Sequence, residues 1–263
     1  MPPLAFQLYS AREHGPWPEA LETLAALGYR SVEGYGALLD EQPDLPAMLA
    51  DHGLHMPVTH VGLDVLESGA ARTFAALRAL GCEAVFCPYL SPEQRPDDVA
   101  GWRTVVRRLH AIGERLKGEG LAFGWHNHDF EFMPLRDGSL PIEVLFDDAS
   151  ELEWEADLAW IQRADADPLI WLERLGERVA AVHVKDIAAP GTADDEDGWA
   201  DPGAGVMDWP ALLAAVQGSG RGASSIHWIA EHDRPSDLAR FARRAHAAFG
   251  GWWQRLDTSV AGS

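Results

Sequence analysis

A short apolar run followed by a longer amphipathic stretch recurs about every 30 residues along the chain, which is the spacing of consecutive strand and helix units. Apolar residues spaced three and four apart predict helices between the apolar runs, for example over residues 19–27, 45–52 and 97–119. Each of these three stretches is followed by a glycine, a residue that commonly ends helices. The apolar runs predict eight strands: residues 5–9, 31–33, 57–60, 84–87, 122–126, 152–157, 180–184 and 226–231.

Eight such units predict an α/β protein whose single domain, residues 1–263, is a (β/α)8 TIM barrel. Parallel strands joined by right-handed helical crossovers can close into a barrel or form an open sheet. No glycine-rich phosphate-binding motif follows the first strand, which argues against the open dinucleotide-binding arrangement. Residues 188–208 interrupt the pattern, because they are acidic and rich in glycine and proline. We expect them to form a long loop on the side where barrel active sites lie.

The charge of the chain limits the partners that it can have. With 41 acidic against 21 basic residues, the formal net charge is −20, which disfavours binding to nucleic acid and to anionic membranes. We expect a small-molecule sugar as the partner, and the formation of a homo-oligomer is left open. The first ten residues do not resemble a signal peptide, and the two cysteines fit a reducing compartment, so a cytoplasmic location is expected.

Polar side chains close most of the predicted strands. Catalytic groups of (β/α)8 barrels lie at the carboxyl ends of the strands, so these positions are candidate site residues. Carboxylates and imidazoles without thiolates form a donor set that suits Mn²⁺, Zn²⁺, Co²⁺ or Mg²⁺. Because so many ionisable groups would be unfavourable together without a cation, we predict one divalent metal ion. The strand-end residues are Gln7, Glu33, His60, His126, Asn127, His128, Asp157, His183, Lys185 and Glu231.

Five segments that include these residues are WHNHDFEF at 125–132, EADLAW at 155–160, HVKD at 183–186, GAGVMDW at 203–209 and AEHD at 230–233. Together they resemble the xylose isomerase-like TIM barrel superfamily, in particular its sugar phosphate isomerase/epimerase family, which is related to tagatose 3-epimerase and inosose dehydratase. The resemblance covers nearly the whole chain. It implies one divalent metal held by an acid from strand five, an Asp from strand six, a His from strand seven and a Glu from strand eight. Asp157, His183 and Glu231 match the last three.

The chain departs from this pattern at strand five. Many members of the superfamily, including tagatose epimerases, carry a metal-binding Glu there, whereas this chain has His126. Either His126 ligates the metal through nitrogen, or Glu131 folds back from the following loop to supply an oxygen. We favour His126, so the predicted metal ligands are His126, Asp157, His183 and Glu231.

The predicted chemistry is proton transfer next to a carbonyl group. A divalent ion that chelates a carbonyl oxygen and a neighbouring hydroxyl stabilises an enediolate, so that the adjacent C–H can be deprotonated. The candidate catalytic residues are Glu231, Glu131, His128 and Lys185. Lys185 could alternatively stabilise the developing oxyanion as a cation.

Three further residues are candidates for contact with the substrate. Glu33 and His60 resemble substrate-contact positions of the superfamily, although a hydrogen bond to the backbone would explain each of them equally well. Trp160 lies three residues beyond Asp157, where epimerase relatives often have a substrate-binding His. The resemblance therefore implies a reshaped pocket at Trp160.

The sequence thus predicts an enzyme of carbohydrate metabolism, first of all a metal-dependent isomerase or epimerase of a ketose or keto-sugar. A lyase on the same scaffold ranks second, either an inosose-type dehydratase or a 3-keto-glycoside eliminase. The enolate could expel a leaving group, and elimination needs only one strong base. A non-catalytic sugar-binding protein ranks third, and the acidic charge disfavours endonuclease activity, which other members of the superfamily have.

Overall fold

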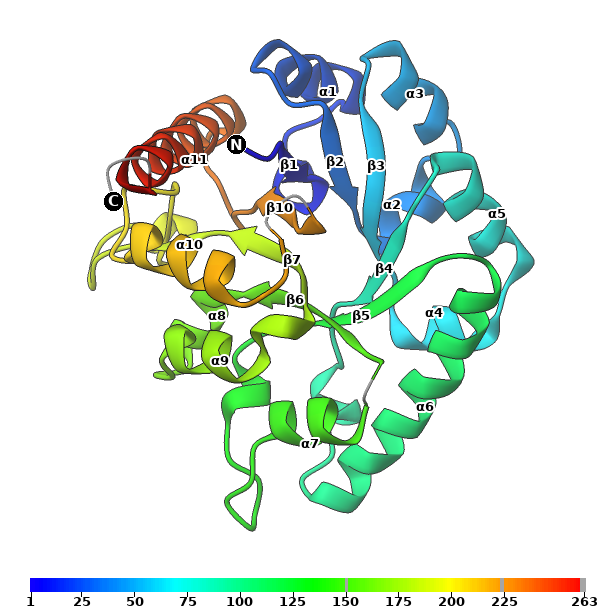
Figure 1. Ribbon diagram of the computed structural model, residues 1–263. Helices are drawn as coiled ribbons and strands as arrows, with labels where there is room; N and C mark the ends of the chain where they lie inside the picture. The colour runs from blue at the N-terminus through cyan, green and yellow to red at the C-terminus, as the bar shows by residue number, and fades with distance from the viewer. Residues whose placement is uncertain (150, 223–224, 261–263) are drawn as a thin grey trace.

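Eight parallel strands form a closed barrel in the order β1-β10-β7-β6-β5-β4-β3-β2. The computed structural model describes residues 1–149, 151–222 and 225–260, the last four of these by their backbone alone. The closed barrel with its surrounding helices confirms the predicted (β/α)8 fold (Figure 1). The barrel strands are β1 (Leu4–Gln7), β2 (Ser31–Gly34), β3 (His55–His60), β4 (Ala84–Cys87), β5 (Ala122–His126), β6 (Glu153–Asp157), β7 (Val179–Val184) and β10 (His227–Ala230).

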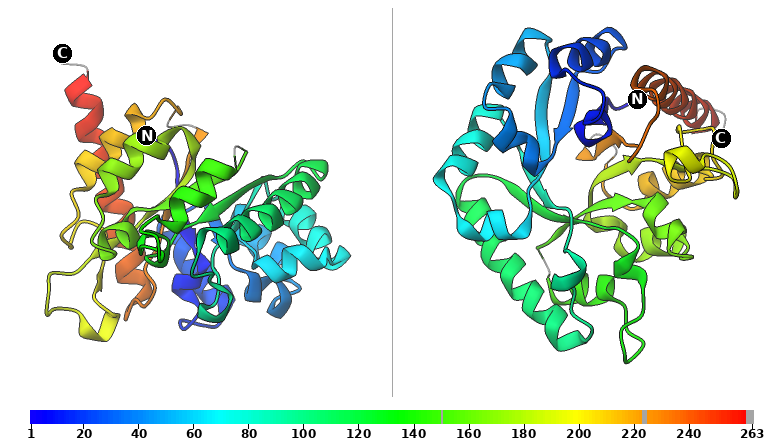
Figure 2. Two further views of the ribbon diagram at one scale, coloured as in Figure 1. Left: turned by 90° about the horizontal axis from the view of Figure 1, so that it is seen from below. Right: turned by 180° about the vertical axis from the view of Figure 1, so that it is seen from behind.

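The helices form a ring around the barrel, and the amino-terminal end of the chain lies near the last helix, α11 (Figures 1 and 2). Several crossovers contain two short helices instead of one. The helices are α1 (Trp17–Ala26), α2 (Gly36–Glu41), α3 (Leu45–Asp51), α4 (Leu63–Ser68), α5 (Ala71–Leu80), α6 (Val99–Gly118), α7 (Pro141–Asp148), α8 (Leu158–Arg163), α9 (Pro168–Leu175), α10 (Trp209–Gly218) and α11 (Leu238–Val260).

Some element boundaries differ from the predicted ones for local reasons. Strand β1 ends at Gln7 rather than at residue 9, because the Gln7 side chain accepts a hydrogen bond from the backbone N–H of Tyr9 and starts a 3₁₀ turn. Helix α6 begins at Val99, because the Asp98 carboxylate accepts a hydrogen bond from the N–H of Gly101 and caps the helix. Strand β10 ends at Ala230, so the predicted site residue Glu231 lies just beyond it.

Apolar and small side chains fill part of the barrel interior, which leaves the carboxyl end for polar groups. This interior cluster consists of Ala5, Val58, Ala84, Phe86, Ala180, Ala181 and Ile229. The ring of Phe86 occupies the space in front of Gly124 on the neighbouring strand, since a Cβ on Gly124 would lie 2.4 Å from that ring. Gly124 therefore has no room for a side chain, and His126 is the next inward-facing position of β5.

The segment 188–208 follows the seventh barrel strand as predicted, and it is organised by Asp186. The sequence did not predict a small hairpin of β8 (Asp186–Ile187) and β9 (Trp199–Ala200). Strand β8 lies just before this region, and β9 lies within it. A Cβ on Gly205 would lie 2.1 Å from Asp186 Oδ1, so this position requires glycine. The Asp186 carboxylate accepts hydrogen bonds of 2.9–3.2 Å from the backbone N–H groups of Ile187, Gly203, Gly205 and Met207.

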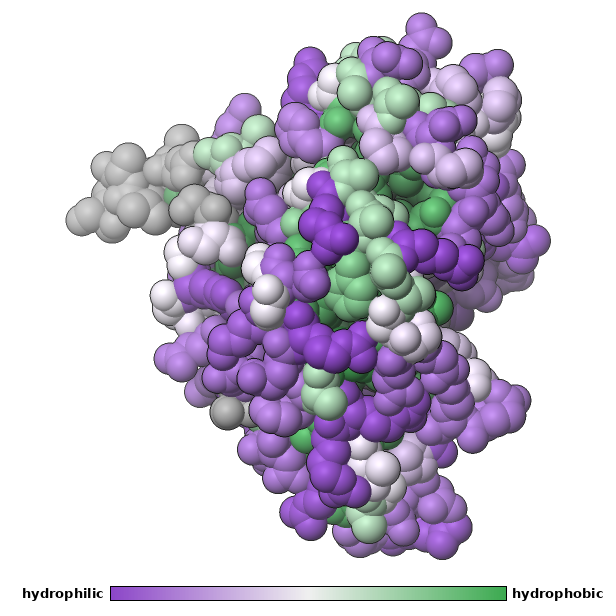
Figure 3. Space-filling model, turned by 90° about the vertical axis from the view of Figure 1, so that its right-hand side faces the viewer, coloured by the Kyte–Doolittle hydropathy of each residue, from purple (hydrophilic) through white to green (hydrophobic). Residues whose placement is uncertain are grey.

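The surface is mainly hydrophilic on the face shown in Figure 3, where apolar side chains form only a narrow strip between charged ones. This agrees with a chain in which acidic residues outnumber basic ones by 41 to 21. Within the described part of the chain, no helix is both long enough and apolar enough to cross a membrane.

Candidate functional site

The polar side chains at the carboxyl end of the barrel form two neighbouring groups. Residues two apart on a strand point to the same side, so Glu155 and Asp157 of β6 both face the interior, and so do His183 of β7 and Lys185 just after it. We call the set from β6, β7 and the residues just after β7 and β10 the mouth group: Asp157, His183, Lys185 and Glu231. We call the set from β2, β3, β5 and the preceding inward position of β6 the deep cluster: Glu33, His60, His126 and Glu155.

The mouth group brings together three residues that were predicted to be metal ligands. His183 Nδ1 lies 2.7 Å from Glu231 Oε2 and 3.7 Å from Asp157 Oδ2. Asp157 Oδ1 accepts hydrogen bonds from two N–H groups in the first turn of α8, which leaves its Oδ2 for the mouth group. One donor atom from each of Asp157, His183 and Glu231 lies within 4.8 Å of the others. These two oxygens and one nitrogen could hold a divalent cation.

Lys185 supplies a positive charge to the mouth group. Its Nζ lies 3.2 Å from Glu231 Oε2, 3.5 Å from Asp157 Oδ2 and 2.5 Å from Asp233 Oδ2. It also lies 4.2 Å and 5.0 Å from the ring centroids of Trp199 and Trp160, within the range of cation–π interactions. Burial alone would lower the pKa of Lys185, but the three carboxylates raise it above its usual value. Lys185 is therefore an ammonium group at neutral pH.

The deep cluster combines two imidazoles with two carboxylates. His126 and Glu155 are partners in the register of β5 and β6, and His126 Nδ1 lies 3.3 Å from Glu155 Oε2. His60 Nε2, from β3, lies 2.5 Å from Glu155 Oε2 and 3.4 Å from Glu33 Oε1. Gln7 holds the other oxygen of Glu33 through a hydrogen bond of 2.6 Å.

His183 connects the two groups, because its two ring nitrogens face different carboxylates. Whereas Nδ1 faces the mouth group, Nε2 lies 2.8 Å from Glu33 Oε2 and 3.5 Å from Glu155 Oε1. One donor atom from each of His60, His126, Glu155 and His183 lies within 4.8 Å of the others. The predicted ligand His126 thus lies among the deep cluster, and its role as the fourth ligand beside Asp157 and Glu231 stays a prediction.

Burial and close charges shift the pKa values of these groups in opposite directions. Burial raises the pKa of Glu33 to about 7, and the neighbouring Glu155 adds to the increase. Burial lowers the pKa of His126 to about 4. Burial also opposes the ionisation of Glu231, yet Lys185 and His183 hold its pKa well below the usual range. Glu231 is consequently a carboxylate at neutral pH.

Several buried polar atoms at the site have no hydrogen-bond partner among the described residues. Each unsatisfied buried polar atom costs about 1–3 kcal/mol, so several of them gathered at one place indicate that a ligand completes the site. Oxygen and imidazole nitrogen atoms fit a divalent cation as that ligand. The atoms are Glu33 Oε1, His126 Nδ1, Glu155 Oε1 and Asp157 Oδ2.

The two other candidate catalytic residues near strand five, Glu131 and His128, lie in different surroundings. Glu131 accepts hydrogen bonds from Trp125 Nε1, at 2.8 Å, and from the backbone N–H of His128, at 2.9 Å. Because Trp125 alternates with His126 along β5, this contact places Glu131 on the outer, helix-covered side of the strand. The His128 ring, in contrast, lies 4.9 Å from the His126 ring and 5.1 Å from the Trp160 ring.

Comparison with known proteins assigns the family. A family model described as the xylose isomerase-like TIM barrel matches residues 21–246, which is most of the chain. The chain belongs to the xylose isomerase-like TIM barrel family. No curated protein sequence matches this xylose isomerase-like chain.

Solved structures with the same fold have low sequence identity to this chain. A protein described as a sugar phosphate isomerase/epimerase from Parabacteroides distasonis ATCC 8503 superposes with a TM-score of 0.75 at 20% identity, covering 94% of this chain and 92% of the other. The IolI protein with a zinc atom gives 0.74 at 15% identity, covering 95% and 97%. A probable 3-DHS dehydratase, AsbF from Bacillus anthracis, gives 0.73 at 12% identity, covering 94% and 98%. At these identities the similarity supports the fold alone.

Two acidic residues of this xylose isomerase-like site were missed by the sequence analysis. Glu155 is two residues before Asp157, so strand alternation alone would have placed both side chains on the same face. Glu155 lies in the interior of the predicted strand 152–157, whereas Asp157 is its last residue, and only Asp157 was predicted to be a site residue. Asp233 lies beyond the end of β10, and its contact with Lys185 depends on how the loop turns, for which the sequence gives no signal.

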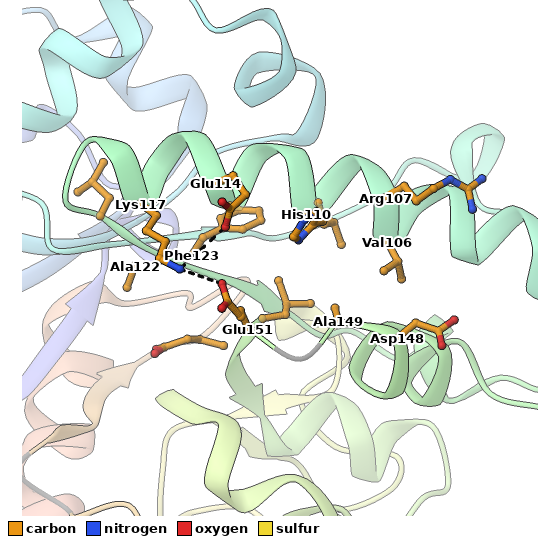
Figure 4. A pocket seen from close by; sticks show the side chains of 15 residues that line it. Val106, Arg107, His110, Glu114, Lys117, Ala122, Phe123, Asp148, Ala149 and Glu151 are labelled. Atoms are coloured by element: carbon orange, nitrogen blue, oxygen red, sulfur yellow. Dashed lines mark hydrogen bonds and ion pairs between the residues drawn. The ribbon is translucent and has the colours of Figure 1, made fainter.

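A hollow of about 750 Å³ lies on the outer wall of the barrel (Figure 4). No residue of the mouth group or of the deep cluster lines it. It is bounded by α6 and by residues at the amino ends of β5 and β6. Lys117 points from α6 toward Glu151, and its Nζ lies 3.2 Å from Glu151 Oε2 (Figure 4). Because catalytic residues of (β/α)8 barrels come from the opposite, carboxyl ends of the strands, we assign this hollow no catalytic role.

Proposed function

We propose that this chain is a divalent-metal-dependent isomerase or epimerase of a small sugar, a ketose or a keto-sugar. The observation that carries the proposal is that metal-donor atoms, a carboxylate and a buried ammonium group meet at the carboxyl end of one barrel. Asp157, His183 and Glu231 would hold the cation. When bound there, a divalent cation would polarise a sugar carbonyl group and make the adjacent C–H more acidic.

Glu231 is the group that we assign as the base. Its low pKa keeps it ionised at neutral pH, and its Oε2 lies beside both His183 Nδ1 and Lys185 Nζ. Lys185 is assigned to stabilise the negative charge that develops on the substrate oxygen, because its high pKa makes it a poor base.

His128 is assigned as a second proton-transfer group, which an epimerase needs on the opposite face of the substrate. Burial lowers the pKa of His128 well below its usual value, so the imidazole is neutral and has a free nitrogen lone pair, although the lowered pKa also makes it a weak base. The ring of Trp160, which lies beside that of His128, is suited to stack on a sugar. His60 and Glu33 of the deep cluster are assigned to contact the substrate from the opposite side of the site.

A lyase is the second candidate function, and the residues of β5 favour it. The inward-facing positions of β5 include Gly124 and His126, so β5 directs no carboxylate into the interior of the barrel. A symmetric pair of carboxylate bases is therefore absent from the described residues of β5 and β10. Elimination needs only one strong base, and one protein of the same fold is described as a probable dehydratase.

The test is a screen by NMR in heavy water. Protein loaded in turn with Mn²⁺, Co²⁺, Zn²⁺ or Mg²⁺ is incubated with a panel of ketoses, keto-sugars and 3-keto-glycosides. An isomerase or epimerase should place deuterium next to the carbonyl carbon of the recovered sugars, whereas a lyase should give an unsaturated carbonyl product that absorbs in the ultraviolet.

Two variants assign the base. Glu231→Gln keeps the size of the side chain and removes its basicity, so exchange should fall by about two to four orders of magnitude. Glu153→Gln changes a carboxylate at the amino end of β6, where it pairs with Arg221, and should retain the wild-type rate. Wild-type exchange in Glu231→Gln would exclude Glu231 as the base. If no sugar exchanges with any of the four metals, the proposal of an enzyme fails and a sugar-binding protein remains.

A further inference from the structure

The deep cluster differs from the mouth group in how its negative charge is neutralised. In the mouth group, Lys185 already supplies an ammonium ion to Asp157 and Glu231. Among the described residues, the ion-pair partners of Glu33 and Glu155 are all histidines. A histidine balances a carboxylate only while it is protonated, and a divalent cation in the deep cluster would take the place of those protons.

We propose that the deep cluster is a second divalent metal site, in which His60, His126 and Glu155 are ligands and Glu33 is within reach as a fourth. This goes beyond the proposed function, in which the mouth group holds the metal and His60 and Glu33 face the substrate. In a tetrahedral site with metal–donor bonds of about 2.0–2.2 Å, neighbouring donor atoms lie about 3.3–3.6 Å apart. His126 Nδ1 and Glu155 Oε2 are 3.3 Å apart, and His60 Nε2 and Glu33 Oε1 are 3.4 Å apart.

A second observation points to a ligand independently of the charge. His126 is 2% exposed, and its Nδ1 has no hydrogen-bond partner within the described residues, although it faces a carboxylate. Glu155 Oε1 and Glu33 Oε1, on fully buried side chains, also have none there. A metal ion accepts electron pairs from all of these atoms at once, which a single proton cannot do.

The donor set indicates which metal the site would take. Two imidazoles with one or two carboxylates suit Zn²⁺ or Co²⁺, whereas Mg²⁺ prefers oxygen ligands and retains its water. His60 Nε2 and Glu155 Oε2 lie 2.5 Å apart. Around a tetrahedral ion these two atoms would have to separate by nearly 1 Å, to the donor spacing of about 3.3–3.6 Å. His183 faces the deep cluster with Nε2 and Glu231 with Nδ1, and as a neutral imidazole it has a lone pair on only one of these nitrogens, so it would be a ligand at one of the two sites.

The number of Co²⁺ ions bound per chain tests the proposal. The protein is stripped with a chelator and saturated with Co²⁺, and excess metal is removed before elemental analysis. Visible absorption of the bound cobalt reports its coordination. Wild type should bind two ions, and His126→Gln, His60→Gln and Glu155→Gln should each bind one and lose part of the absorption. Asp157→Asn and Glu231→Gln should each lose the ion of the mouth group and retain the ion of the deep cluster.

His227→Gln is the matched control, because His227 lies on β10 outside the deep cluster, and it should bind two ions. Circular dichroism of the stripped variants checks folding, and three deep-cluster variants carry the same prediction in case one of them does not fold. Wild-type cobalt content in His126→Gln and His60→Gln would overturn the proposal, as would a single ion lost only from Asp157→Asn and Glu231→Gln. A single ion lost only from the deep-cluster variants would support the deep site and remove the metal from the proposed function.

Discussion

Glu131 and Glu155 are both fully buried, yet they lie on opposite sides of the barrel wall and differ in charge. Burial disfavours the ionised form of Glu155, but the imidazoles of His60 and His183 hold its pKa well below the usual range. For Glu131, burial outweighs its hydrogen bonds with Trp125 and His128 and raises its pKa to about 8. The difference between these two buried glutamates therefore comes from the imidazoles beside Glu155, which have no counterpart beside Glu131 among the described residues.

Glu131→Gln should change how stability depends on pH. A carboxyl group that ionises near pH 8 when folded and near pH 4.5 when unfolded binds more protons in the folded state between these values. Its contribution to stability is therefore complete below about pH 4.5 and is lost as the pH rises toward 8. Wild type should lose up to a few kcal/mol more than Glu131→Gln over this interval, measured by urea unfolding at a series of pH values.

Glu143→Gln is the control for this measurement. The hydrogen bond from Arg174 lowers the pKa of Glu143, so this group is ionised in both states above about pH 5.5 and should give no difference in slope from there to pH 8. Parallel curves for wild type and Glu131→Gln would contradict a neutral Glu131 in the folded protein.

Single residues of the site could be predicted where a strand end reveals them, as for Asp157, His183 and Glu231. The sequence left open whether the side chain of His126 or that of Glu131 joins the ionisable groups inside the barrel, because the path of the chain after β5 decides it. The hydrogen bond from Trp125 to Glu131 places Glu131 on the outer side of β5, and it depends on tertiary packing that no local pattern contains.

At the scale of elements, the sequence predicted the barrel strands well, because most of them are short runs rich in apolar residues between helical patterns. The hairpin of β8 and β9 was not predicted, since each of its strands has only two residues. Its position depends on Asp186, whose carboxylate gathers four backbone N–H groups from either end of the loop. The hairpin in turn holds Trp199 against Lys185.

Asp186→Asn should loosen this loop. An amide group has one acceptor oxygen, so about half of the four hydrogen bonds are lost and an N–H group faces the remaining donors. We expect a loss of about 2–4 kcal/mol in the free energy of unfolding and faster proteolysis within residues 188–208. Urea unfolding and limited proteolysis with mass spectrometry measure the two effects. Gly205→Ala should act similarly, because its Cβ would collide with Asp186.

Asp208→Asn serves as the matched control. The Asp208 carboxylate caps α10 by accepting a hydrogen bond from the N–H of Ala211, and asparagine is also a good capping residue. This variant should lose well under 1 kcal/mol and leave the loop resistant. If Asp186→Asn is cleaved no faster than Asp208→Asn, then Asp186 does not organise the loop.

At the scale of the whole molecule, the number of repeated units predicted closure of the barrel, and the charge predicted the nature of its surface. Surface ion pairs such as Arg108 with Glu67 and Arg174 with Glu143 offset only part of the repulsion among acidic groups. Each exposed pair contributes at most about 1 kcal/mol to the free energy of unfolding. With a formal net charge of −20, repulsion between distant acidic groups should oppose the compact state.

Monovalent salt should therefore stabilise this protein. Added salt shortens the distance over which charges interact to about 10 Å at 0.1 M, so it weakens repulsion across the molecule more than attraction within close pairs. The melting temperature of the chelator-treated protein should rise by a few degrees between low and moderate sodium chloride, measured by calorimetry. Sucrose at equal osmolality distinguishes screening from a general solute effect. A melting temperature that falls with sodium chloride would mean that ion pairs outweigh the repulsion among the excess acidic groups.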